Sequence, residues 1–90
     1  MNYHVIWTHD ATDSLTEAYL QAVNRNDAQI VTQRMAEIER MLKEDPIENS
    51  ESRDEGERVM MALPLVVHFR IVVSLRMISV SRVRLAPQKK

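Results

Sequence analysis

Hydrophobic and polar residues alternate at the beginning of the chain and again over its last third. In "NYHVIWT", the residues Tyr3, Val5 and Trp7 fall on one side, which is the period of a strand with one buried face. Three more stretches with this period, "RVMMAL", "LVVHFRIVV" and "RMISVSRVRL", follow an acidic, polar connection around Gly56. The pattern predicts an N-terminal strand and a C-terminal meander of three strands, with the last turn around Ser74.

Between the first strand and the meander, hydrophobic residues recur at the spacing of two amphipathic helices. Asp10 is placed to cap the first helix and Asp27 the second, and Pro46 ends the second. The short "NRND" connection makes the helices antiparallel neighbours. Their predicted core stripes are Leu15, Ala18, Tyr19, Ala22 and Val23 in the first helix and Ile30, Val31, Met35, Ile38, Met41 and Leu42 in the second.

The order of these elements predicts an α+β fold of the type β-α-α-β-β-β. Ninety residues suffice for one compact domain and not for two, so residues 1–90 are interpreted as a single domain. We expect a mainly antiparallel, four-stranded sheet with the helix hairpin packed on one of its faces.

Alternation also assigns the charged residues of the meander to a face of the sheet. If Val67, Phe69, Ile71 and Val73 pack under the helices, then Val66, His68, Arg70 and Val72 point to the opposite, open face. In the last strand the odd positions carry no charge, so we place the even positions outward: Arg76, Ile78, Val80, Arg82 and Arg84. With Arg58 also outward, the sequence predicts a basic open face without a carboxylate.

The distribution of charge along the chain agrees with such a face. Residues 1–57 hold all thirteen acidic residues and five basic ones, whereas residues 58–90 hold seven basic residues and no acid. This asymmetry is consistent with a dipole that steers a polyanion or an acidic partner to one side. It is equally consistent with strand residues whose counter-ions lie on the helices.

Several classes of chemistry are excluded or disfavoured by composition. The chain has no cysteine, so neither a disulfide nor a thiolate metal site can form. The three histidines lack the paired spacing of metal ligands, and we expect no metal and no cofactor. No apolar run approaches the length that spans a bilayer, and no secretory leader is evident. We expect a cytoplasmic protein that does not bind membranes.

The ordered set of segments resembles the RelE/ParE superfamily of toxins from bacterial type II toxin–antitoxin systems, which includes proteins of the plasmid stabilisation type. The chain carries "VIWTHDATDSLTEAY" at its start, a helix ending in "LKEDP", then "SRDEGERVMMALPLVVHFRI" and a closing "ISVSRVR". The resemblance covers essentially the whole chain and depends on the order of the segments rather than on one motif. It implies a helix pair on one face of the sheet and, in the ribosome-dependent members, a basic concave face that holds mRNA for cleavage.

The residues that the resemblance associates with RNA cleavage are only partly present. There is no lysine between Lys43 and Lys89 and no tyrosine after Tyr19, and "LVV" stands where many relatives have an arginine. The residues that remain for binding a target or an antitoxin are Arg53, Arg58, Arg70, Arg82 and Arg84. Because arginine stays protonated, it is a poor proton shuttle. A ribonuclease mechanism would therefore depend on His68 as the acid or base.

The resemblance leaves more than one function open, and with it the question of whether the chain is an enzyme. The gyrase-directed branch needs no such catalytic set, so we rank a ParE-like toxin that binds its target, such as DNA gyrase, ahead of a RelE-type endonuclease that cuts mRNA on the ribosome. A non-toxic relative that keeps the fold ranks third. A general RNA-binding module would interleave exposed aromatic residues, and only Phe69 is available. In each toxin interpretation the partner is a cognate antitoxin that covers the basic face.

Overall fold

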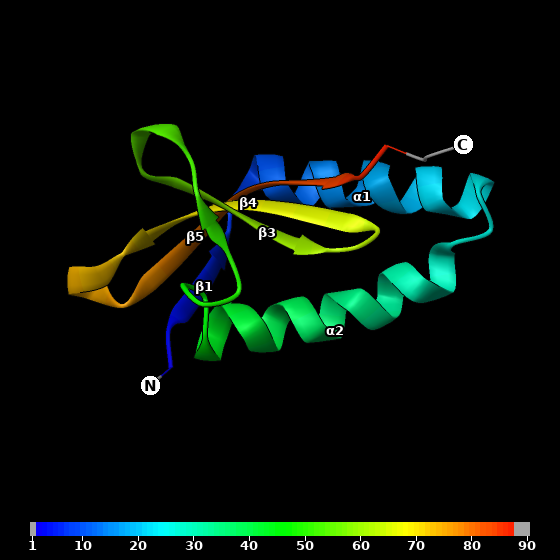
Figure 1. The fold of residues 1–90 in the computed structure, drawn as a ribbon. Coiled ribbons are helices and arrows are strands. Elements are labelled where there is room, and N and C mark those ends of the chain that lie inside the picture. The colour runs from blue at the N-terminus through cyan, green and yellow to red at the C-terminus, as the bar shows by residue number, and fades with distance from the viewer. Residues whose placement is uncertain (1, 88–90) are drawn as a thin grey trace.

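The computed structural model describes residues 2–87, which form two helices and a five-stranded sheet (Figure 1). Two short 3-10 turns, Asp54–Gly56 and Val73–Leu75, interrupt the strands. The predicted α+β class, helix hairpin and order of elements are confirmed. The elements are β1 (His4–Trp7), α1 (His9–Asn24), α2 (Ala28–Glu44), β2 (Glu51–Ser52), β3 (Glu57–Ala62), β4 (Leu65–Val72) and β5 (Met77–Leu85).

The sheet has the strand order β1-β5-β4-β3-β2. Strand β1 pairs with β5 in parallel, and all other neighbours are antiparallel. The prediction of four strands was one short, because the two-residue strand β2 lies in the polar segment that was interpreted as a connection. Its register places Glu51 opposite Val59 on β3. This edge strand extends the sheet on the side away from β1.

Helix α1 begins two residues earlier than the sequence pattern suggested. Its N-cap residue is Thr8, whose hydroxyl accepts a hydrogen bond from the amide of Ala11 at 3.1 Å, and Asp10 lies in the first turn. A carboxylate there still interacts favourably with the positive end of the helix. For α2 the predicted N-cap residue, Asp27, is correct, although its side chain makes no capping hydrogen bond.

Both helices pack on one face of the sheet and share a single hydrophobic core. Buried residues of the helices include Ala18, Ala22, Val31, Ile38 and Leu42. Paired residues on adjacent strands point to the same side of a sheet, so the register defines the rows beneath the helices. These rows are Val5, Ile78 and Ile71; Trp7, Val80 and Phe69; Val83, Val67 and Met60; and Leu85, Leu65 and Ala62.

Strand β5 departs from regular alternation, and the prediction for its even positions is wrong in part. Ile78 and Val80 are fully buried beneath the helices, yet Val83 and Leu85 are buried on the same side. The pairing with β4 shifts by one residue, because Phe69 pairs with Val80 and His68 with Arg82. Ser81 is the extra residue of this β-bulge, and its hydroxyl donates to the carbonyl oxygen of His68 at 3.1 Å.

Three further predictions of burial are corrected. Val73 lies in the turn between β4 and β5 and is exposed, and Arg76 follows it with a positive φ of 50°. The turn itself is at the predicted position. Tyr19 and Val23 are also exposed, since they lie at the edge of the α1 stripe and the smaller Ala18 and Ala22 make the closest approach to the sheet.

The bulge generates a test that uses two deletions. Removal of Ser81 leaves a regular ladder in which Val80 still pairs with Phe69 and Arg82 with His68. We expect this variant to fold, with a loss of about 1 kcal/mol for one hydrogen bond. Removal of Ser79 instead forces Ser81 opposite Phe69 and Val80 onto the open face, at a cost of about 1.5–3 kcal/mol for the lost burial alone.

Urea unfolding of both deletion variants and of the unaltered chain measures these costs. A deletion of Ser81 that destabilises the protein more than the deletion of Ser79 would contradict the assignment of the bulge.

Candidate functional site

The face of the sheet opposite the helices carries the residues that the sequence analysis selected. Register groups its side chains into four rows across the strands. Arg70, Arg82 and Arg84 all project from this open face, as predicted, and Val66 and His68 lie between them. The rows are His4, Met77 and Val72; Ile6, Ser79, Arg70 and Glu57; Arg82, His68, Val59 and Glu51; and Arg84, Val66 and Met61.

The open face is hollowed between β4, β3 and the turn that precedes β3. The hollow has a volume of about 810 Å³. It contains both basic and acidic side chains, so the prediction of an open face without a carboxylate is wrong. The sequence analysis missed Glu57 because this residue lies immediately before the basic part of the sequence. The turn at Asp54–Gly56 adds Asp54 and Glu55 to the same hollow. The lining residues are Ser52, Arg53, Asp54, Glu55, Glu57, Val59, Met61, His68, Arg70 and Arg84.

Each ring nitrogen of His68 has a neighbouring charged side chain. The Nε of Arg84 donates a hydrogen bond to Nε2 of His68 at 3.2 Å, and because arginine is always a donor, this nitrogen carries no proton. Oε1 of Glu57 lies 3.6 Å from Nδ1, which is too long for a hydrogen bond but favours a proton on that nitrogen. The geometry corresponds to a neutral imidazole in the Nδ1–H tautomer, in which the lone pair of Nε2 accepts the hydrogen bond from Arg84.

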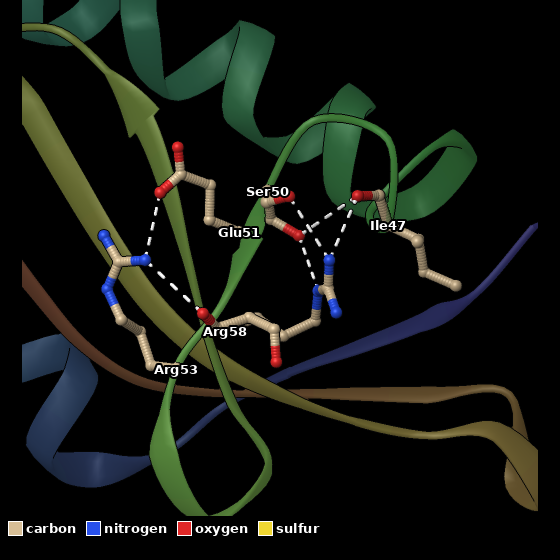
Figure 2. A network of polar contacts seen from close by, with 6 residues as sticks. Ile47, Ser50, Glu51, Arg53 and Arg58 are labelled. Carbon is tan, nitrogen blue, oxygen red and sulfur yellow. Dashed lines mark hydrogen bonds and ion pairs between the residues drawn. The ribbon is translucent and has the colours of Figure 1, made fainter.

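Arg58 does not lie on the open face, which corrects the sequence prediction. It pairs with Phe69 and therefore projects to the helix side, as Met60 and Ala62 do on the same strand. Its guanidinium donates to the hydroxyl of Ser50 at 2.7 Å and to the carbonyl oxygens of Ser50 and Ile47, each at 3.2 Å (Figure 2). Arg58 thus connects β3 to the segment that follows α2.

Two more of the selected arginines are used in the same way. Arg53 contacts the carboxylate of Glu51 at 3.0 Å and the carbonyl oxygen of Ser52 at 3.4 Å (Figure 2). Arg70 donates to the carbonyl oxygen of Glu55, at a turn where Gly56 has a φ of 80°. Together with Arg58, these residues hold the segment between α2 and β3 in place. Sequence periodicity could not reveal this, since their acceptors are mostly backbone carbonyls.

Arg82 and Arg84 also border a second hollow, on the other side of β5. Strand β1 pairs only with the first part of β5, from Met77 to Val80, and beyond it α1 runs beside the strand (Figure 1). The hollow between them has a volume of about 330 Å³. The side chain of Arg82 makes no hydrogen bond or ion pair with the described residues. The lining residues are Ser14, Glu17, Ala18, Gln21, Arg82, Val83, Arg84 and Leu85.

Within residues 2–87, no three His, Asp or Glu side chains gather as ligands for a metal ion. Neither helix in that range is long and apolar enough to cross a bilayer. The lining of the open-face hollow offers guanidinium groups, one imidazole and carboxylates.

Comparison with known proteins identifies the fold. No protein-family model and no curated protein sequence matches the chain. A chain of the toxin–antitoxin complex RelBE2 from Mycobacterium tuberculosis superposes with a TM-score of 0.65 and 19% identity, over 94% of this chain and 99% of that one. A chain of the chromosomal ParDE toxin–antitoxin system from P. aeruginosa gives 0.69 and 18%, over 94% and 97%.

These similarities show the fold of the chain, a mainly antiparallel sheet with a helix hairpin on one face. The protein has the RelE/ParE-type toxin fold, as the sequence resemblance implied.

Arginines that bond to the segment between α2 and β3 can be distinguished from exposed ones by the effect of alanine substitution on stability. Because Arg58→Ala removes three hydrogen bonds that connect β3 to the segment after α2, we expect a loss of about 1–3 kcal/mol. Arg82→Ala removes an exposed side chain that has no hydrogen-bond partner within residues 2–87, and we expect a change within about 0.5 kcal/mol. Chemical denaturation measures both values, and equal losses in the two variants would contradict the assignment.

Proposed function

We propose that this chain is the toxin component of a type II toxin–antitoxin system and that a cognate antitoxin neutralises it. The observation that carries the proposal is the similarity of fold over almost the full length to chains from two toxin–antitoxin complexes. We place the functional surface on the open face, around Arg70, Arg82 and Arg84. The antitoxin would cover these arginines, and the toxin would act in the cytoplasm.

For the mode of action, we propose that the toxin binds its target rather than cutting RNA, with DNA gyrase as the first candidate. Support comes from His68, the only imidazole in the hollow, whose Nε2 is occupied by Arg84. Support also comes from Asp54, Glu55 and Glu57 in the same hollow, because carboxylates repel the phosphates of an RNA strand. A binding toxin requires neither a free base nor a uniformly basic surface.

A ribosome-dependent mRNA endonuclease is the second candidate, and one contact favours it. The carboxylate of Glu57 lies beside Nδ1 of His68, an arrangement that fixes a histidine tautomer and supports the imidazolium formed when the other nitrogen takes a proton. His68 would then act as the base and Arg84 would hold a phosphate. This mechanism requires Arg84 to leave Nε2 when substrate binds.

Growth during induced expression tests the proposed function. We expect the chain alone to arrest growth and co-expression of the adjacent reading frame to restore it. Replacing both Arg82 and Arg84 with alanine should weaken toxicity or antitoxin binding while circular dichroism stays unchanged, since both side chains project from the surface. Arg76→Ala is the matched control, because Arg76 lies in the β4–β5 turn, away from the hollow. Growth that continues in every case would contradict the proposal.

His68→Ala distinguishes the two modes of action. If the protein cuts mRNA, this variant should lose ribosome-dependent cleavage completely, since the hollow holds no second imidazole to move the proton. If the protein binds its target, neither the unaltered chain nor the variant should produce new mRNA ends. Cleavage is measured by mapping mRNA ends after induction. Cleavage that survives the substitution would remove His68 from any mechanism.

A further inference from the structure

The arginines of the chain differ in what their guanidinium groups contact. Most have an oxygen acceptor: a backbone carbonyl, a hydroxyl or a carboxylate. Arg84 contacts a neutral imidazole nitrogen instead, and the side chains of Arg82 and of Arg76, in the β4–β5 turn, make no hydrogen bond or ion pair within the described residues. Oxygen acceptors are found at Arg25, Arg34, Arg40, Arg53, Arg58 and Arg70.

Arg82 and Arg84 are well placed to act together. They are two residues apart on one strand and project to the same side, with Cα atoms about 6.6 Å apart at the usual rise of a strand. Both border the hollow between α1 and β5, and Arg84 also borders the hollow of the open face. An oxyanion at this pair would accept charge-assisted hydrogen bonds, which are about twice as strong as those between neutral groups.

We propose that Arg82 and Arg84 bind a carboxylate of a protein partner, and that this binding draws Arg84 away from His68 and exposes Nε2. The inference extends the proposed function, since it names the chemistry by which the open face recognises a protein. A carboxylate that pairs with Arg84 through Nε and one Nη, in a bidentate arrangement, takes the donor that now serves Nε2 of His68. Binding of the carboxylate and release of the imidazole are therefore a single event.

Glu57 determines what the released imidazole can do. Because its carboxylate favours the proton on Nδ1, Nε2 keeps a lone pair after Arg84 has left. The exposed nitrogen then accepts a hydrogen bond from an amide or hydroxyl of the partner. The surface thus recognises a partner that presents a carboxylate next to a hydrogen-bond donor.

Charge and hydropathy of the open face favour a protein over a nucleic acid. Asp54, Glu55 and Glu57 line the same hollow, and a chain with a phosphate at every nucleotide would bring several charges near them. A single carboxylate avoids this repulsion. Ile6 and Met61 are exposed on the face, at 43% and 55%, and they suit apolar side chains beside the acid. The rows of the open face contain no Phe, Tyr or Trp on which bases could stack.

Nuclear magnetic resonance on the full chain, labelled with 15N at histidine and arginine, tests the coupling. The probe is a capped pentapeptide, Ser-Leu-Glu-Leu-Ser, and its control has Gln in place of Glu. We expect the Glu peptide to move the signals of Arg84 Nε and His68 Nε2 with the same midpoint, and the Gln peptide to move neither. Arg84→Gln should weaken binding at least tenfold, and Arg76→Gln should leave it unchanged.

Arg82→Gln provides a second variant, since it weakens the carboxylate contact without touching the Arg84–His68 hydrogen bond. No shift up to 20 mM peptide would overturn the proposal, as would Arg84 signals that move while those of His68 stay fixed. A hexauridylate that binds more tightly than the peptide at about 0.15 M salt, where charges are screened within about 8 Å, would assign the face to nucleic acid. These outcomes do not depend on toxicity. The peptide titration can therefore be interpreted whether or not the growth test succeeds.

Discussion

The shift of one residue in the pairing of β4 with β5 is the constraint on which both faces of the sheet depend. Ile78 and Val80 occupy even positions and Val83 and Leu85 odd ones, yet all four are buried under the helices. A strand with unbroken alternation cannot do this. With Ser81 set aside from the ladder, the inward side stays apolar along the whole strand, and Arg82 and Arg84 come to lie opposite His68 and Val66.

The arginines selected from the sequence have two different structural roles. Arg53, Arg58 and Arg70 donate to carbonyl oxygens of the segment between α2 and β3, which has little regular backbone pairing of its own. A guanidinium suits this task because it offers five donors in a fixed plane. Arg82 and Arg84 have no such duty. The surface available to a partner is therefore narrower than the number of arginines suggests.

Local pattern was sufficient for the two helices and for the order of the longer elements along the chain, since hydrophobic periodicity is a property of each segment alone. It failed where the answer depended on a partner strand. The side on which Arg58 lies follows from its pairing with Phe69, and the position of Glu57 beside His68 follows from the same register. The cap of α1 was misplaced for a smaller reason, because Thr8 and Asp10 are both good capping residues and only the end of β1 decides between them.

The parallel pairing of β1 with β5 has a consequence for how the protein is made. The hydroxyl of Thr8 donates to the carbonyl oxygen of Val80, and the two residues are 72 positions apart. At a synthesis rate of about 5–20 residues per second, β1 waits on the order of 4–14 s for its neighbour. During that interval the helix hairpin has no complete sheet to cover its apolar stripe. The open face around Arg82 and Arg84 forms in the same late step, because both residues lie on β5.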